Sequence, residues 1–123
     1  MGKPTNLAGI KKIVYDLLNM IKLFIDTTSN KKIIVRLQID EKEYVVQKEL
    51  TSYKAQIILP VIVSLLKEYT LSFQDINAIE VNPGPGSFTG VRVGVSVANA
   101  LSYALDIPVN GKKDMSFVEP VYA

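Results

Sequence analysis

One segment of the chain combines glycine, proline and hydroxyl residues in a spacing that suggests binding chemistry. It runs from Pro83 to Gly94; it follows an apolar run that ends at Val81 and overlaps the start of another that begins at Val91. Prolines restrict the backbone, and glycines permit positive φ angles and close approach of other groups. The first N–H groups of a helix lack partners within it, so such a turn could bind an anion. The candidate anion-binding residues are Gly84, Pro85, Gly86, Ser87, Phe88 and Thr89.

The spacing of this segment differs from that of the general phosphate-binding motifs. A Walker motif places four residues between its first glycine and a Gly-Lys pair. Here five residues separate Gly84 from Gly90, and Val91 stands where the lysine would be. A dinucleotide-binding fingerprint would need a glycine at Thr89, one position before Gly90. The alternative interpretation is therefore a purely structural turn.

The residues after the turn, 91–105, are predicted to form a helix with a stripe of small side chains. Interior glycines cost a helix about 1 kcal/mol each, so a compensating close contact is expected. That contact is either with this protein's own first helix or with another protein, and the pattern leaves both interpretations open. We expect a partner interface made by this stripe together with one residue of the polar side: Gly90, Gly94, Ala98, Ser102 and Arg92.

The chain contains neither histidine nor cysteine. Thiolate nucleophiles, cysteine-containing zinc sites and every histidine-based triad or general base are therefore excluded. No catalytic residue, metal site or cofactor is expected. Asp26, at the end of the first apolar run, is interpreted as a turn and capping residue, because Thr27 to Asn30 contain no glycine for a phosphate loop.

The elements that would position these residues alternate in a recognisable order. Period-two alternation predicts strands at 21–26, 33–39 and 44–46, joined by short polar connections. A helix over 55–69 follows, with Thr51 or Ser52 as its N-cap and a kink expected at Pro60. Its apolar stripe is Ala55, Ile58, Leu59, Ile62, Leu66 and Tyr69. Short strands at 78–81 and 107–109 enclose the glycine-rich turn and the second helix. The fold class is thus α/β, with a mixed five-stranded sheet covered by helices.

Three parts of the chain are distinguished by pattern. Residues 1–19 are predicted to be an amphipathic helical extension, since apolar side chains recur at three- and four-residue steps: Leu7, Ile10, Ile13, Val14, Leu17, Leu18 and Ile21. This extension could cap the domain, contact a partner, or derive from a start site assigned upstream of Met20. Residues 20–111 contain the predicted strands and the two later helices, and residues 112–123 are a polar tail.

Charge and hydropathy limit the partners. The net charge is +2, with 14 basic and 12 acidic side chains, so no large basic surface for nucleic acid is expected. No apolar run has the length of a membrane span, and the N-terminus lacks the apolar core of a signal peptide, which makes the cytoplasm the expected location.

The residues 82–101, NPGPGSFTGVRVGVSVANAL, resemble the signature of the TsaB (YeaZ) family. Further similar segments, in the same order as in the family, are LFIDTTSNKKIIVRL at 23–37, QIILPVI at 56–62 and DINAIEV at 75–81. The resemblance covers residues 20 to about 111. It implies an actin-like ASKHA fold of which this chain has the first lobe. It also implies a non-catalytic subunit that pairs with a threonylcarbamoyl transferase (TsaD-like), joined by an ATPase subunit (TsaE-like), in forming threonylcarbamoyladenosine on tRNA.

The sequence departs from the family pattern in three places. The family normally carries a second lobe, and the sequence resembles only the first, so one wall of an interlobe nucleotide cleft is expected to be absent. Lys54 stands where the family usually has histidine, and Asn82 replaces a glycine or arginine. In ASKHA enzymes an acidic residue at the position of Asp26 helps to hold metal and phosphate, so Asp26 is kept as a candidate ligand residue. Two alternatives to the scaffold role remain open: an ATP-binding or glycoprotease-like enzyme, and a degenerate self-associating homodimer without a role in tRNA modification.

Overall fold

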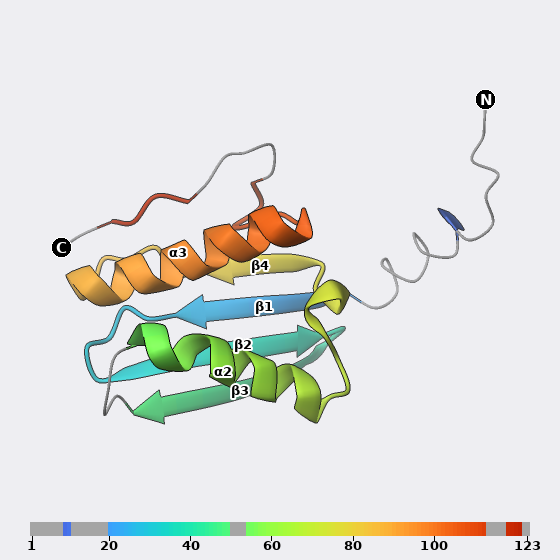
Figure 1. The fold of residues 1–123 in the computed structure, drawn as a ribbon, viewed down its shortest axis with the longest axis horizontal. Coiled ribbons are helices and arrows are strands. Elements are labelled where there is room, and N and C mark those ends of the chain that lie inside the picture. The colour runs from blue at the N-terminus through green and yellow to red at the C-terminus, as the bar shows by residue number, and fades with distance from the viewer. Residues whose placement is uncertain (1–8, 11–19, 50–53, 113–117, 122–123) are drawn as a thin grey trace.

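The computed structural model describes residues 9–10, 20–49, 54–112 and 118–121. Three strands come first, β1 (Ile21–Asp26), β2 (Lys32–Ile39) and β3 (Lys42–Glu49). The helix α2 (Lys54–Glu68), a short 3₁₀ turn (Phe73–Asp75) and β4 (Ala78–Val81) follow, and the helix α3 (Phe88–Leu105) is the last regular element. Figure 1 shows both helices on the same face of a single twisted sheet. This order of strands and helices was predicted from the sequence.

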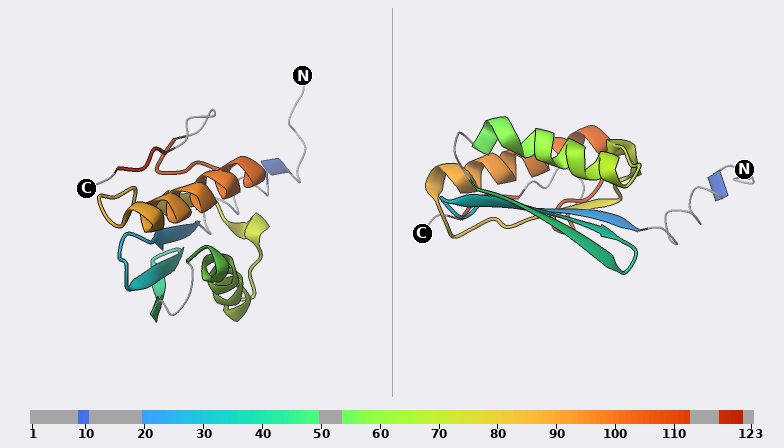
Figure 2. Two further views of the ribbon diagram at one scale, coloured as in Figure 1. Left: turned by 60° about the vertical axis from the view of Figure 1, so that its left-hand side comes forward. Right: turned by 90° about the horizontal axis from the view of Figure 1, so that it is seen from below.

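The sheet has the strand order β3-β2-β1-β4. β1 pairs with β2, and β2 with β3, in antiparallel fashion, whereas β4 lies parallel to β1. Alternate side chains of β1 and β2 are buried beneath the helices: Ile21, Leu23, Ile25, Ile33, Val35 and Leu37. The intervening side chains face the other way, toward the side without a helix in Figure 2. The alternation read from the sequence therefore correctly identifies the core face.

The prediction of a fifth strand at 107–109 is not confirmed, because the sheet formed by the described residues has four strands. Val109 forms only isolated bridges, one of them parallel to Ile79. The backbone turns away at Asn110, which has φ 50°. The Asn110 side chain then continues the pairing, since its amide accepts a hydrogen bond from the Val81 N–H (2.8 Å) and donates one to the Val81 carbonyl (3.0 Å). The side-chain amide of Asn110 thus forms, at the sheet edge, the two hydrogen bonds to Val81 that the backbone of a neighbouring strand would form.

The helix α2 continues through Pro60 without a break. Three members of its predicted apolar stripe, Ile58, Ile62 and Leu66, are fully buried. Leu59 was wrongly assigned to this stripe, because it is 43% exposed. The buried stripe instead includes Val61 and Leu65. The expected N-cap at Thr51 or Ser52 lies outside the described residues.

The helix α3 begins at Phe88, three residues before the start predicted from the apolar pattern. Ser87 is its N-cap, and the Ser87 hydroxyl accepts a hydrogen bond from the Gly90 N–H (3.4 Å). The helix ends where Asp106 adopts a left-handed conformation. No described helix is both long and apolar enough to cross a membrane.

The two ends of the chain are described only in part. Of the predicted N-terminal extension, Gly9 and Ile10 are described and helical, and the rest lies outside the described residues. In the region assigned to the tail, residues 118–121 run beside α3 (Figure 1). The Asn99 side chain of α3 donates to the Val118 carbonyl (2.9 Å) and accepts from the Val118 N–H (3.0 Å). Val118 is buried and belongs to the core.

Candidate functional site

The glycine-rich turn connects the end of β4 to the start of α3 and is held on two sides. On one side, the Val121 N–H donates a hydrogen bond to the Pro83 carbonyl (2.6 Å). Gly84 has φ 106°, and a Cβ atom there would overlap the Val121 carbonyl oxygen. The Gly84–Pro85 peptide bond is cis. Glycine at position 84 is therefore required both by its backbone conformation and by the segment that crosses it.

On its other side the turn packs against the loop that follows β1. The Ser87 N–H donates to the Thr28 carbonyl (2.9 Å). A Cβ atom on Gly86 would lie 2.6 Å from the Thr28 Cβ and 2.7 Å from its carbonyl oxygen, so only glycine fits there. The turn is thus clamped between the β1–β2 loop and residues 118–121.

These contacts bear on the predicted anion site at Gly84 to Thr89. The Gly84 N–H donates to the Asn82 side chain (3.1 Å), the Ser87 N–H to Thr28, and the Gly90 N–H to the Ser87 hydroxyl. Pro85 has no N–H. Much of the donor capacity of the turn is therefore used within the chain, which favours the structural interpretation. Anion binding at this turn stays a prediction.

The small-residue stripe of α3 faces the protein's own core. Gly90, Gly94, Ala98 and Ser102 are all buried within this chain, which favours the intramolecular one of the two interpretations. A partner interface made by these residues stays a prediction. A Cβ atom on Gly94 would overlap Oγ1 of Thr27, a fully buried residue whose hydroxyl donates to the Gly90 carbonyl (2.6 Å). The small side chains allow the helix to lie directly on the end of β1.

The same stripe is held at its far end by a hydroxyl group. Ser102 donates from Oγ to the Ile107 carbonyl (2.5 Å), which anchors the chain after α3 to the helix. The contact expected from the glycines is therefore intramolecular, although it is made with β1 and its loop rather than with the first helix.

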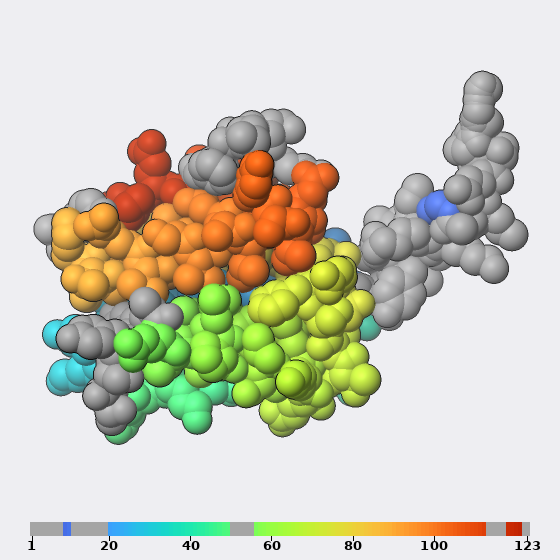
Figure 3. Space-filling model, in the orientation of Figure 1, coloured from blue at the N-terminus to red at the C-terminus, as the bar shows by residue number. Residues whose placement is uncertain are grey.

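Arg92, the fifth residue of the expected interface, is exposed. Its guanidinium lies 5.4 Å from the centre of the Phe88 ring, and Phe88 is itself 56% exposed. Tyr103 is 65% exposed on the last turns of the same helix. Leu59 of α2 is exposed as well, so both helices of the layer that faces the viewer in Figure 3 carry exposed apolar side chains. A role for Arg92 in an interface stays a prediction.

Sequence reasoning missed these exposed side chains. Leu59 was placed in the core stripe and Phe88 in the turn. The only available signal was that α3 has bulky apolar residues beside its small stripe, of which Val93, Val97 and Leu101 are only partly buried.

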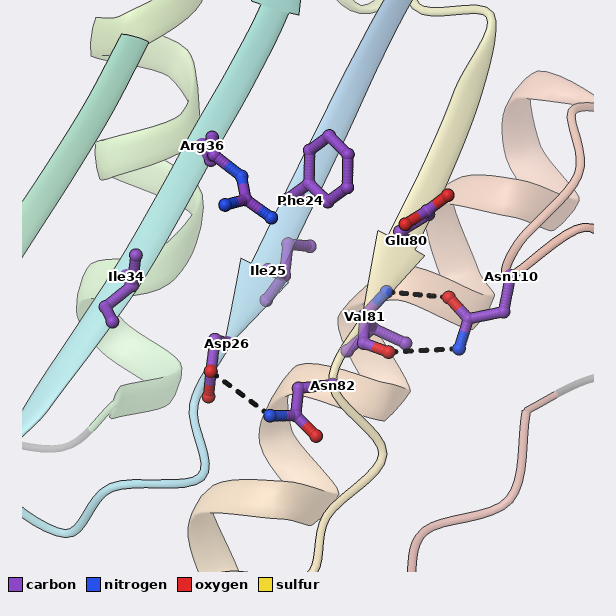
Figure 4. Close-up of a pocket in the computed structure, with 9 residues that line it drawn as sticks. All are labelled: Phe24, Ile25, Asp26, Ile34, Arg36, Glu80, Val81, Asn82 and Asn110. Atoms are coloured by element: carbon purple, nitrogen blue, oxygen red, sulfur yellow. Dashed lines mark hydrogen bonds between the residues drawn. The ribbon is translucent and has the colours of Figure 1, made fainter. Parts of the chain in front are cut away.

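Asp26 lies at the carboxyl end of β1, beside a hollow on the face of the sheet away from the helices (Figure 4). Its Oδ1 accepts hydrogen bonds from the Thr28 N–H (2.9 Å) and hydroxyl (2.7 Å), and its Oδ2 accepts one from the Asn82 amide (3.2 Å). This is the geometry of a turn-capping aspartate. A ligand role for Asp26 stays a prediction.

The hollow has a volume of about 510 Å³ and mixed lining. Its polar groups include Arg36 and Glu80, and its apolar wall includes Phe24 and Ile34. The Arg36 guanidinium stacks 4.3 Å from the centre of the Phe24 ring, and Glu80 forms an ion pair with Lys22 at 3.6 Å. Within the described part of the chain, no three or more acidic side chains are grouped so as to hold a metal ion.

Comparison with known proteins shows the relationship of this chain. Residues 39–116, more than half of it, match the family model of TsaD, tRNA N6-adenosine threonylcarbamoyltransferase. The tRNA threonylcarbamoyladenosine biosynthesis protein TsaB of Bacillus subtilis is 46% identical over 52 residues, which are 42% of this chain and 23% of the relative. TsaB of Haemophilus influenzae is 33% identical over 91 residues, 74% of this chain and 38% of the relative.

A solved structure agrees with these relatives. YeaZ from Pseudomonas aeruginosa has a TM-score of 0.70 and 30% sequence identity, with 78% of this chain and 45% of that chain covered. A second matching structure is of an uncharacterized protein with similarity to peptidase YeaZ from Pseudomonas aeruginosa. The chain spans less than half the length of these relatives. By the matched family model, the relatives and the shared fold, the chain belongs to the TsaB (YeaZ) family.

Proposed function

We propose that this chain is a non-catalytic subunit that supports synthesis of threonylcarbamoyladenosine on tRNA in the cytoplasm. Its partner would be a threonylcarbamoyl transferase of the TsaD type, with an ATPase subunit of the TsaE type as a further member of the complex. Contact with tRNA would be indirect. The single actin-like ASKHA lobe implied by the family resemblance is part of this proposal.

The observation that carries the proposal is the exposed apolar area on the two helices. The region matched by the family model, residues 39–116, includes α2, the glycine-rich turn and α3. On these elements Leu59, Phe88 and Tyr103 are 43%, 56% and 65% exposed. Covering such side chains is favourable by about 25 cal/mol for each Å² of apolar area removed from water. A protein partner on the helix layer would provide that cover.

The side-chain chemistry supports a non-catalytic role. A peptidase needs a nucleophile with a base, or a metal with its ligands, and the sequence contains no histidine and no cysteine. Asp26, which is bonded to Asn82 beside the glycine-rich turn, already accepts three hydrogen bonds from its own chain. Its geometry serves the turn rather than a reacting group.

Binding to the transferase tests the proposal. The purified chain and the transferase from the same cell are mixed and resolved by size-exclusion chromatography with light scattering. We expect a complex with the unaltered chain and its loss with Leu59→Asp, which places a charge on the outer surface of the helix layer. Val45→Asp is the matched control, since Val45 is similarly exposed on the opposite face of the sheet. Circular dichroism establishes that both variants are folded. If Leu59→Asp leaves the complex intact, the interface does not include Leu59 of α2. If the unaltered chain forms no complex with the transferase, the proposal is refuted.

The similarity of one matching structure to a peptidase keeps an enzyme as the second candidate. ATP hydrolysis or peptide cleavage that co-purifies with the chain and is lost in Asp26→Asn would favour it. The third candidate is a homodimer without a role in tRNA modification. In the same light-scattering measurement it would appear as a stable dimer that does not bind the transferase.

A further inference from the structure

The face of the sheet away from the helices carries no layer of described residues. Figure 2 shows α2 and α3 together on the other side. The strand register places one row of side chains across this open face: Glu80, Phe24, Arg36 and Val45, on β4, β1, β2 and β3 respectively. A mixed sheet with helices on one side only leaves the second face without the cover that such sheets commonly have.

The open face has an apolar centre. Phe24 and Ile34 line the hollow shown in Figure 4, and Val45 is 53% exposed at the end of the row. Between them the Arg36 side chain stacks on Phe24, and its Nε is buried without a hydrogen-bond partner among the described residues. The side chains toward the ends of the strands are polar or charged. This is a small apolar patch with a polar border, the pattern of a docking surface rather than of a fully solvated face.

The sequence itself provides a segment of matching character. Residues 7–18 have an apolar stripe at helical spacing, made by Leu7, Ile10, Ile13, Val14, Leu17 and Leu18. Most of this segment lies outside the described residues. Ile10 is described; it is helical and 46% exposed, so this member of the stripe is not covered in the structure.

The dimensions of the segment suit the open face. Twelve residues of helix are about 18 Å long, close to the roughly 20 Å of a six-residue strand such as β1. A helix is about 10 Å wide, and three adjacent strands are separated by two spacings of about 4.8 Å. A helix lying over β2 would therefore reach both Phe24 and Val45. Only Asn19 and Met20 separate residue 18 from the first residue of β1, so the segment is attached to the sheet where β1 begins.

Charge favours the same placement to a smaller extent. The open face has four carboxylates (Asp26, Glu43, Glu49 and Glu80) and three cations (Lys22, Lys32 and Arg36). Residues 1–19 have three lysines (Lys3, Lys11 and Lys12) and one carboxylate (Asp16). Surface charges are strongly screened at physiological salt, so this attraction guides the helix and the apolar stripe contributes most of the binding.

We propose that residues 7–18 dock as an amphipathic helix on the open face of the sheet, over Phe24, Ile34 and Val45, and form a third layer of the domain. The apolar stripe faces the sheet and Lys12 and Asp16 face solvent. The interaction is intramolecular, and it is independent of the proposed role with the transferase, which concerns the opposite face.

The absence of native cysteine allows a direct test in the full chain. A single cysteine is introduced as Val45→Cys, and its rate of modification by a maleimide is measured. The rate is then measured with Val14→Asp, which puts a charge in the stripe, and with Tyr15→Asp, which makes the same change of charge on the polar side of the helix. Leu59→Cys, on the helix layer, is the reference site that neither substitution should affect.

We expect Val14→Asp to raise the labelling rate at position 45 by at least about tenfold, equivalent to about 1.4 kcal/mol of docking free energy. Tyr15→Asp should leave the rate within about twofold of the unaltered helix, since it spares the stripe. Equal rates in all three backgrounds would overturn the proposal. Protection that weakens on dilution, with a dimer in light scattering, would also overturn it, because a second copy would then be the occupant.

Discussion

Replacement of Gly94 by alanine is the sharpest test of how α3 packs on the sheet. A Cβ atom at position 94 would overlap Oγ1 of Thr27, and it would lie 3.3 Å from the Thr27 Cβ and 3.4 Å from its Cγ2. Thr27 is fully buried, and its hydroxyl donates to the Gly90 carbonyl. The new methyl group must therefore move the helix or turn the Thr27 side chain away from its acceptor.

The magnitude follows from two opposing effects. Overpacking costs roughly 1–3 kcal/mol, and a buried hydroxyl or carbonyl left without its partner costs about 1–3 kcal/mol. Alanine improves the intrinsic stability of the helix by about 1 kcal/mol relative to glycine. The steric effect is the larger, so we expect Gly94→Ala to lower the free energy of unfolding by about 2 kcal/mol.

Urea unfolding followed by circular dichroism measures this free energy, with Ser96→Ala as the control at an exposed position of the same helix. A double-mutant cycle with Thr27→Ala identifies the cause. Because Thr27→Ala removes Oγ1 and Cγ2, we expect Gly94→Ala to cost at least about 1 kcal/mol less in that background. If Gly94→Ala proves neutral or stabilising in the unaltered chain, α3 does not lie against Thr27 and the packing described above is incorrect.

Two further substitutions test the segment that crosses the glycine-rich turn. Gly84→Ala should lower the free energy of unfolding by about 1–3 kcal/mol, since the added Cβ meets the Val121 carbonyl at a positive φ angle; a stability within about 0.5 kcal/mol of the unaltered chain would show that residue 121 lies elsewhere. Asn99→Leu removes both hydrogen bonds to Val118, and we expect amide exchange at Val118 to accelerate by about tenfold or more while α2 keeps its protection; unchanged exchange at Val118 would contradict the role of Asn99 as an anchor.

The sheet and the helices were predictable because their signals are local. The alternation in β1 and β2 and the three-to-four-residue period in α2 depend on neighbouring residues, and both placed the core correctly at Ile25, Val35 and Ile62. The Ser87 cap was not recognised, which explains why the start of α3 was placed at Val91.

The errors concern contacts between residues far apart in the chain. The small stripe of α3 required a close neighbour, but only the fold shows that this neighbour is Thr27, 63 residues from Gly90. The strand expected at 107–109 is a similar case. The Asn110 side chain takes over the pairing with Val81, and no local sequence pattern indicates that a side chain will do so. The residue types in a segment indicate that a close contact is needed, but only the tertiary structure shows which residues make that contact.

Reconstitution of the tRNA modification tests the central functional claim most directly. The transferase and ATPase subunits from the same cell are incubated with unmodified tRNA, ATP and a threonylcarbamoyl donor, with and without this chain. Threonylcarbamoyladenosine is then measured by mass spectrometry of the digested tRNA. We predict that the product forms only when the chain is present, and that Leu59→Asp reduces it as strongly as it reduces complex formation. Product formed at the same rate without the chain would contradict the account.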